Sequence, residues 1–183
     1  MIDILYEDEY LLVCLKPVGI LSQACVRLEG HPFQMHLTKP VAEMFDTLVY
    51  DIQDVGCRYY TFISTLKNAM EDCAKANKRL GVLDRGNPLG GLVEGTALQA
   101  ECRSFVGCWK MPQRYGLTCG EFARMVNEEE RIGCDLRVVP CEGLKRSMTF
   151  RDWGRLWVMP SLAMPRFETA LLYPGTCLLE GTN

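Results

Sequence analysis

The chain has 183 residues, of which 48% are hydrophobic and 23% are charged, values typical of a globular domain that buries a substantial core. Its 20 basic and 23 acidic residues give a net charge of -3 without a long run of one sign, so the composition argues against nucleic-acid binding. No apolar run approaches the roughly 18–20 residues that cross a bilayer, and the acidic N-terminus does not resemble a secretory signal. We therefore expect a cytoplasmic protein with one domain, or one domain and an appendage, and no membrane association.

Cysteine is frequent, with ten residues, but the spacing does not indicate a metal site. No two cysteines form a C-x-x-C pair, and His31 and His36 stand far from most of them. A disulfide framework is conceivable, but without an export signal we expect reduced thiols that pack as small hydrophobic groups. We predict no metal and no cofactor.

The first half of the chain contains three recognisable stretches in sequence order. Residues 3–15, "DILYEDEYLLVCL", are two short apolar runs split by acidic residues, a pattern that predicts a strand pair or a strand and a turn. Residues 24–40 have no clear period and are expected to form a connection. Residues 47–52, "TLVYDI", form a continuous apolar run of strand length, as in a strand covered on both faces.

The remaining elements alternate between helix and strand. Apolar residues from Phe62 to Cys73 recur on one helical face, residues 80–84 read as a strand, and residues 85–91 read as an irregular loop. A capping box formed by Thr118 and Glu121 starts a second helix, and residues 135–140 form a third strand. This order of strands and helices predicts an α/β fold with a parallel sheet.

Each predicted strand runs into a carboxylate, namely Asp51, Asp84 and Glu142. Ligands of open parallel sheets bind outside the carboxyl ends of the strands, so polar groups there are candidates for function. The alternative is that strand-end aspartates cap the next helix or fix a turn, and this alternative is strongest for Asp84. Three further polar residues lie close to Asp51 in the sequence: Gln53, Asp54 and Arg58. An arginine beside two carboxylates would lower their pKa and orient them.

Other motifs add less. The loop "RGNPLGG" matches neither phosphate-binding pattern, so it predicts no nucleotide site, although Asn87 could display its amide to a ligand. No Ser-His-Asp or Cys-His arrangement is supported. Several aromatic residues could stack on sugar rings or, alternatively, pack in the core: Tyr59, Tyr60, Trp109, Tyr115, Trp153 and Trp157.

Several longer stretches resemble one enzyme family. They are "LVYDIQDVGCRYYTFISTL", "VLDRGNPLGG", "VEG", "YGLTCGEFARMVNEE", "EGLKRSM" and "MPRFETALLYPGTCLLEGTN". Together they make residues 36–183 similar to the exo-β-N-acetylmuramidases of the NamZ type, which release N-acetylmuramic acid from the non-reducing end of peptidoglycan fragments. The resemblance implies a Rossmann-like parallel sheet with flanking helices, here an incomplete domain. A Pro-Glu-His-Gly motif of the family is not found in this sequence.

Residues 3–23, "DILYEDEYLLVCLKPVGILSQ", instead resemble the opening of an RNA pseudouridine synthase. The catalytic His-Arg-Leu-Asp motif of that family is missing, and the nearest string is "VRLEG". We therefore expect a synthase-like stub at residues 1–23, a connection at residues 24–35 and a partial muramidase-like α/β domain at residues 36–183.

Glycoside hydrolysis needs a group that protonates the leaving oxygen and usually a second group that activates water or attacks carbon. The resemblance supplies three catalytic candidates, Asp51, Asp54 and Glu180. It supplies substrate-binding candidates for muramic-acid saccharides at Gln53, Arg58, Tyr60, Asp84, Arg85, Asn87 and Asn183. Two other functions remain open: an inactive α/β unit that binds sugar or a partner, and an RNA pseudouridine synthase. The sequence does not predict an oligomeric state.

Overall fold

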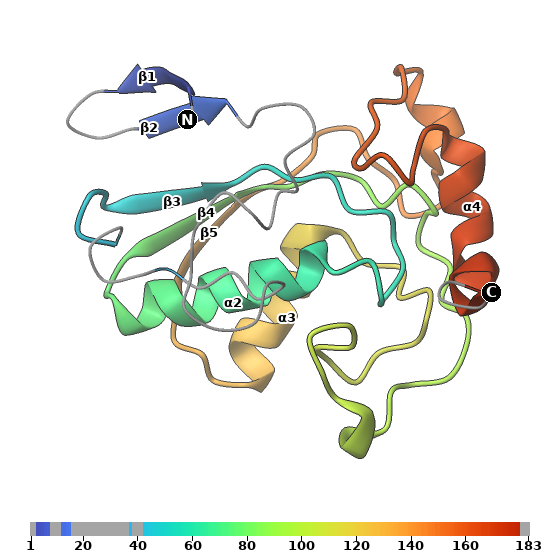
Figure 1. The fold of residues 1–183 in the computed structure, drawn as a ribbon, viewed down its shortest axis with the longest axis horizontal. Helices are drawn as coiled ribbons and strands as arrows, with labels where there is room; N and C mark the ends of the chain where they lie inside the picture. The colour runs from blue at the N-terminus through green and yellow to red at the C-terminus, as the bar shows by residue number, and fades with distance from the viewer. Residues whose placement is uncertain (1–2, 8–11, 16–36, 38–41, 180–183) are drawn as a thin grey trace.

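The computed structural model describes residues 3–7, 12–15, 37 and 42–179 (Figure 1). These residues form an α/β fold in which strands and helices alternate as the sequence predicts. The main elements are β1 (Asp3–Glu7), β2 (Leu12–Leu15), β3 (Thr47–Tyr50), α2 (Phe62–Lys75), β4 (Arg79–Leu83), α3 (Cys119–Glu129), β5 (Asp135–Val139) and α4 (Phe167–Thr176). Three short 3-10 turns complete the list: η2 (Ala100–Cys102), η3 (Phe150–Trp153) and η4 (Cys177–Leu179).

The N-terminal strand pair is confirmed. β1 and β2 pair antiparallel, with Asp3 opposite Leu15 and Glu7 opposite Leu12. They form a two-stranded sheet that is separate from the main one. The connection predicted for residues 24–35 lies outside the described residues.

The main sheet has the order β3-β4-β5, and both of its strand pairs are parallel. The register places Leu48 beside Leu80 and Leu80 beside Leu136, so these leucines form one row across the sheet. α2 and α3 lie on the same side of the sheet (Figure 1), and this row packs into the core that they cover. The carboxyl ends of all three strands therefore meet at one edge.

The opposite face of the sheet is open in the described part of the chain. Val49 is 43% exposed, and Leu83 and Val139 are also exposed. The expectation that the first strand of the main sheet is covered on both faces is therefore wrong for Val49. The physical reason is that α2 and α3 pack on one face only, and an apolar run does not show how many faces are covered.

The two helices that the sequence predicts, α2 and α3, pack as their patterns indicate, whereas α4 was not predicted. In α2 the side chains of Leu66, Met70 and Cys73 are completely buried, which confirms the apolar face. In α3 the Thr118 hydroxyl accepts from the Glu121 amide at 3.1 Å while the Glu121 carboxylate accepts from the Thr118 amide at 2.9 Å, so the capping box is confirmed.

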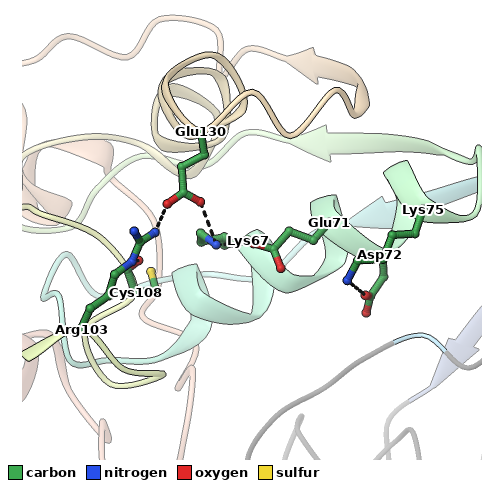
Figure 2. A network of polar contacts seen from close by, with 7 residues as sticks. All are labelled: Lys67, Glu71, Asp72, Lys75, Arg103, Cys108 and Glu130. Atoms are coloured by element: carbon green, nitrogen blue, oxygen red, sulfur yellow. Dashed lines mark hydrogen bonds and ion pairs between the residues drawn. The ribbon is translucent and has the colours of Figure 1, made fainter. Parts of the chain in front are cut away.

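A charged network ties the loop after η2 to both helices (Figure 2). Lys67 of α2 lies 2.9 Å from a carboxylate oxygen of Glu130 at the end of α3 and also pairs with Glu71. Arg103 binds the other oxygen of Glu130 and donates to the Cys108 carbonyl at 2.9 Å. Because the side chains of Lys67 and Glu130 are mostly buried, the network stabilises the position of the loop after η2.

The eight cysteines within residues 42–179 are free thiols. Five of them are buried, in agreement with their predicted role as small hydrophobic groups: Cys57, Cys73, Cys108, Cys119 and Cys134. Burial raises the pKa of the Cys57 and Cys73 thiols to about 12. No helix among the described residues is both long and apolar enough to cross a bilayer.

Candidate functional site

The candidate site lies where β3 and β4 end, at the edge of the sheet that the sequence pattern indicated. Asp51 is the first residue after β3, and Arg85 is the second residue after β4. The Arg85 guanidinium donates to one Asp51 oxygen from Nε at 2.7 Å and lies 2.6 Å from it through Nη2. Both side chains are more than two-fifths exposed, so a ligand can reach them from solvent.

Asp54 lies deeper, beneath the loop that Asp51 begins. Its side chain is 3% exposed, and its Oδ2 accepts from the Gly56 amide at 2.7 Å and from the Tyr115 hydroxyl. The other carboxyl oxygen, Oδ1, has no protein partner among the described residues. Burial raises the pKa of Asp54 from 3.8 to about 7, and the hydrogen bonds from Tyr115 and Gly56 offset part of that increase.

Arg58 does not lie between the two aspartates. Its Nη1 donates to the carbonyls of Thr96 and Met111, at 3.1 and 2.5 Å, in the long segment between β4 and α3. The expectation that an arginine lowers the pKa of the neighbouring carboxylates is therefore wrong for Asp54, whose pKa is raised by burial. Arg58 is close to both aspartates in the sequence, but backbone carbonyls far along the chain orient its guanidinium away from them.

Gln53 joins the two strand-end loops. Its amide donates to the Asp54 carbonyl at 2.8 Å and to the Gly86 carbonyl at 3.1 Å. These bonds set the spacing between the loop after β3 and the loop after β4. Within the described part of the chain, Gln53 therefore has a positional role whether or not it also contacts a ligand.

Asp84 caps α3, as the structural alternative for this residue anticipated. Its Oδ1 accepts from the Gly120 amide at 2.8 Å, and its Oδ2 accepts from the Thr118 hydroxyl at 2.7 Å. The Arg85 amide also donates to Oδ1, at 3.0 Å. A Cβ at Gly120 would collide with this carboxylate, so glycine is required for the close approach.

Asn87 is buried, and its amide is used within the chain. Its Oδ1 accepts from the Leu89 amide at 2.9 Å, and its Nδ2 donates to the Leu117 carbonyl at 3.0 Å. A side chain at Gly56, which has a φ of +84°, would collide with Asn87. Asn87 therefore holds the loop after β4 against the loop before α3, and displays less of its amide than the sequence suggested.

The aromatic candidates lie mostly in packed surroundings. The Tyr60 ring is buried and stands edge-on to Phe62 and Tyr173, at centroid distances of 4.7 and 5.8 Å. Burial also raises the pKa of Tyr60 to about 12. Trp109 and Tyr115 are buried in the main core, which matches the packing alternative rather than sugar stacking. Sequence reasoning missed the contact of Tyr115 with Asp54, since 61 residues separate the two.

Two candidate residues, Glu180 and Asn183, lie outside the described residues. Glu142, which follows β5, is exposed. Across residues 3–7, 12–15, 37 and 42–179, no group of three or more His, Cys, Asp or Glu side chains has the arrangement of a metal site.

Next to the strand-end loops lies a pocket of about 160 Å³ between the loop after β4 and the start of α3. Its lining includes Asn87, Gly90, Thr118 and Arg146. A larger and more open hollow of about 400 Å³ lies at the other end of α3, around Arg131 and the residues leading into β5. The smaller pocket is the one that adjoins the candidate site.

Residues 32–168 match the sequence profile of the family described as exo-beta-N-acetylmuramidase NamZ, N-terminal. The chain belongs to this family. It is similar to the peptidoglycan beta-N-acetylmuramidase NamZ of Bacillus subtilis (strain 168), with 46% identity over 149 residues, which are 79% of this chain and 36% of that protein. The profile match begins at residue 32, so it leaves the interpretation of residues 1–23 as a prediction.

Two solved structures share the fold of this NamZ-family chain. Both are DUF1343 family proteins from Bacteroides fragilis NCTC 9343. The first is 44% identical, with a TM-score of 0.76, and the match covers 79% of this chain and 38% of that one. The second is 36% identical, with a TM-score of 0.73, and the match covers 79% and 41%. The chain thus spans about two-fifths or less of the length of these relatives.

Proposed function

We propose that the chain provides part of the active-site cleft of a glycoside hydrolase that releases N-acetylmuramic acid from the non-reducing end of peptidoglycan fragments. Membership of the NamZ family supports the reaction class. The observation that carries the proposal to this site is the exposed Asp51–Arg85 pair at the carboxyl ends of β3 and β4. A carboxylate and a guanidinium at that edge can bind both the hydroxyl groups and the acidic group of a muramic-acid sugar.

Arg85 is the described residue best suited to the lactyl carboxylate that distinguishes N-acetylmuramic acid from N-acetylglucosamine. A guanidinium binds a carboxylate through two parallel hydrogen bonds, and Arg85 already holds Asp51 with two of its nitrogens. Binding of the sugar would exchange Asp51 for the lactyl group. Arg58 and Asn87 keep supporting roles, since their polar groups bond to the backbone. Asn183 stays a candidate for the sugar hydroxyls.

Among the three candidate carboxylates we assign different roles. Asp51 is exposed at the strand end and is the described group that can contact the reacting sugar. Glu180 is the candidate for the second group that the reaction requires. Asp54 is buried under the loop, so we assign it to positioning: its Oδ2 fixes the Gly56 amide and the Tyr115 hydroxyl, which sets the shape of the loop that carries Asp51.

The test is the release of N-acetylmuramic acid from a synthetic β-glycoside by the purified chain. We expect turnover of this substrate and none of the matching N-acetylglucosamine glycoside. Asp51→Asn should lose turnover. The matched control is Asp135→Asn, because Asp135 is also exposed and paired to an arginine, Arg79, but at the opposite end of the sheet. Equal loss in both variants, or retained turnover in Asp51→Asn, would remove Asp51 from the mechanism.

One observation favours a second function, a sugar-binding unit without turnover. The chain matches 36–41% of the length of its relatives, so groups elsewhere in those proteins can be required for chemistry. Binding of N-acetylmuramic acid without release from the glycoside would select this function. Absence of both binding and turnover would contradict both.

A further inference from the structure

An aromatic ring packs on the loop after β4 directly beside the candidate site. Gly86, the residue that follows Arg85, is buried. A Cβ at Gly86 would lie 2.3 Å from Cζ2 of Trp153 and 2.9 Å from Cδ1 of Leu144. Because glycine has no side chain, the indole ring of Trp153 reaches the loop backbone, one residue from the Asp51–Arg85 pair.

The short turn η3 holds this ring in place. The Phe150 amide donates to the Pro88 carbonyl at 2.9 Å, so η3 is hydrogen-bonded to the loop after β4. The Asp152 carboxylate accepts from the Thr149 amide at 2.8 Å and closes the turn. The Phe150 ring stands edge-on to the Trp153 ring, at a centroid distance of 5.2 Å. These contacts order the indole ring without a ligand, which lowers the entropic cost of using it in binding.

The indole nitrogen of Trp153 is buried and has no acceptor within the described part of the chain. Protein interiors leave few such donors unpaired, and an unpaired donor calls for an explanation. The nearby Trp157, by contrast, donates to the Met164 carbonyl at 2.9 Å. The Trp153 residue as a whole is only partly buried. An ordered ring with an unused donor and an exposed part is typical of a residue that contacts a ligand.

The pocket of about 160 Å³ adjoins the same glycine. Asn87, the residue after Gly86, and Leu144, which meets the Gly86 Cβ position together with Trp153, both line it. The charged pair, the Trp153 ring and the pocket therefore surround one short stretch of the loop after β4. A pyranose ring has apolar faces and a polar rim, so an aromatic ring beside a charged pair suits both of its parts.

We propose that Trp153 is a substrate-contacting residue, whose indole ring packs against the apolar face of a bound muramic-acid sugar while Arg85 binds the carboxylate of that sugar. The inference rests on the proposed function and adds to its site a residue from η3. Packing of the ring against the sugar removes apolar surface of both from water, which favours binding. Gly86 permits the contact, since a larger residue would push the ring away.

The first test follows the fluorescence of the purified chain as N-acetylmuramic acid is added. The chain has three tryptophans, Trp109, Trp153 and Trp157. We expect the emission to change and quenching by acrylamide to decrease, because the sugar covers Trp153. Trp153→Phe should lose this response. The matched control Trp157→Phe should keep it, because Trp157 packs against the second small core, around Phe167.

Isothermal titration calorimetry gives the size of the contribution. Trp153→Leu should weaken the binding of N-acetylmuramic acid by about tenfold, and Trp153→Phe by less than about threefold, because phenylalanine keeps an aromatic face. Gly86→Ala should weaken binding by displacing the ring, and it should have little further effect in the Trp153→Leu protein. The control is Gly175→Ala, since a Cβ at Gly175 meets no atom within 4 Å.

Binding that leaves the tryptophan fluorescence and the quenching unchanged, with the same affinity in Trp153→Leu, would overturn this inference and leave the proposed function standing. An equal fluorescence response in Trp153→Phe and Trp157→Phe would also overturn it. Absence of any binding by the unsubstituted chain would overturn both the inference and the proposed function. If circular dichroism shows that Trp153→Leu does not fold, the two phenylalanine variants decide, because each keeps an aromatic ring.

Discussion

Replacement of Asp54 by asparagine should remove a specific pH dependence from the stability of the fold. Asp54 is 3% exposed, and one of its carboxyl oxygens has no protein partner among the described residues. Asparagine has nearly the same shape, keeps an oxygen for the Gly56 amide and the Tyr115 hydroxyl, and does not titrate. The substitution therefore isolates the ionisation of one buried carboxyl group.

The sign follows from the raised pKa. The pKa of Asp54 is 3.8 unfolded and about 7 folded, so the folded state binds more protons between these pH values. The stability that Asp54 contributes is complete below pH 3.8 and is lost as the pH rises through about 7. With about 1.4 kcal/mol per pH unit, the free energy of unfolding falls by roughly 2.5 kcal/mol between about pH 5 and about pH 8.

The assay is urea unfolding of both proteins, followed by circular dichroism, at about pH 5 and about pH 8. The free energy of unfolding of the variant, relative to the unsubstituted chain, should increase by roughly 2.5 kcal/mol from the lower to the higher pH. Asp135→Asn is the control and should show no such change, because Asp135 is exposed. A difference between Asp54→Asn and the unsubstituted chain that is the same at both pH values would refute the reasoning.

Substitutions at three further positions test the fold. Leu66→Ala empties a completely buried site in α2 and should lower the free energy of unfolding by about 3 kcal/mol, measured with urea; a loss below about 1 kcal/mol would mean that the site collapses. Thr118→Ala removes the cap of α3 and should cost about 1–2 kcal/mol in the same assay, whereas Thr118→Ser should restore most of it. Glu130→Gln leaves Lys67 and Arg103 without their shared carboxylate and should cost about 1–2 kcal/mol, with a smaller loss at high salt; a loss independent of salt would contradict the ionic role.

Local pattern predicted most of the fold. The apolar period of residues 62–73 and the Thr118–Glu121 capping box correspond to α2 and α3 within a residue or two. Both signals are local, because a helix buries one face and its first turn needs a side-chain acceptor. The exposure of Val49 could not be read in this way, since an apolar strand does not record which of its faces another element covers.

The sequence predicted where the candidate site lies on the sheet, but not which of its side chains are buried or how they are oriented. The ends of β3 and β4 do bring Asp51 and Arg85 together, as expected from parallel strands. The burial of Asp54 depends on Tyr115, and the orientation of Arg58 depends on the carbonyls of Thr96 and Met111. Those partners come from segments far along the chain, so the local sequence does not contain the information.

The most direct test of the central claim is the affinity of the chain for N-acetylmuramic acid, measured by isothermal titration calorimetry beside N-acetylglucosamine. The account predicts that the chain prefers the muramic acid, and that Arg85→Gln weakens its binding by about tenfold or more. Arg79→Gln, at an arginine of similar exposure at the other end of the sheet, should bind normally. Equal affinity for the two sugars, or an unchanged affinity in Arg85→Gln, would contradict the account.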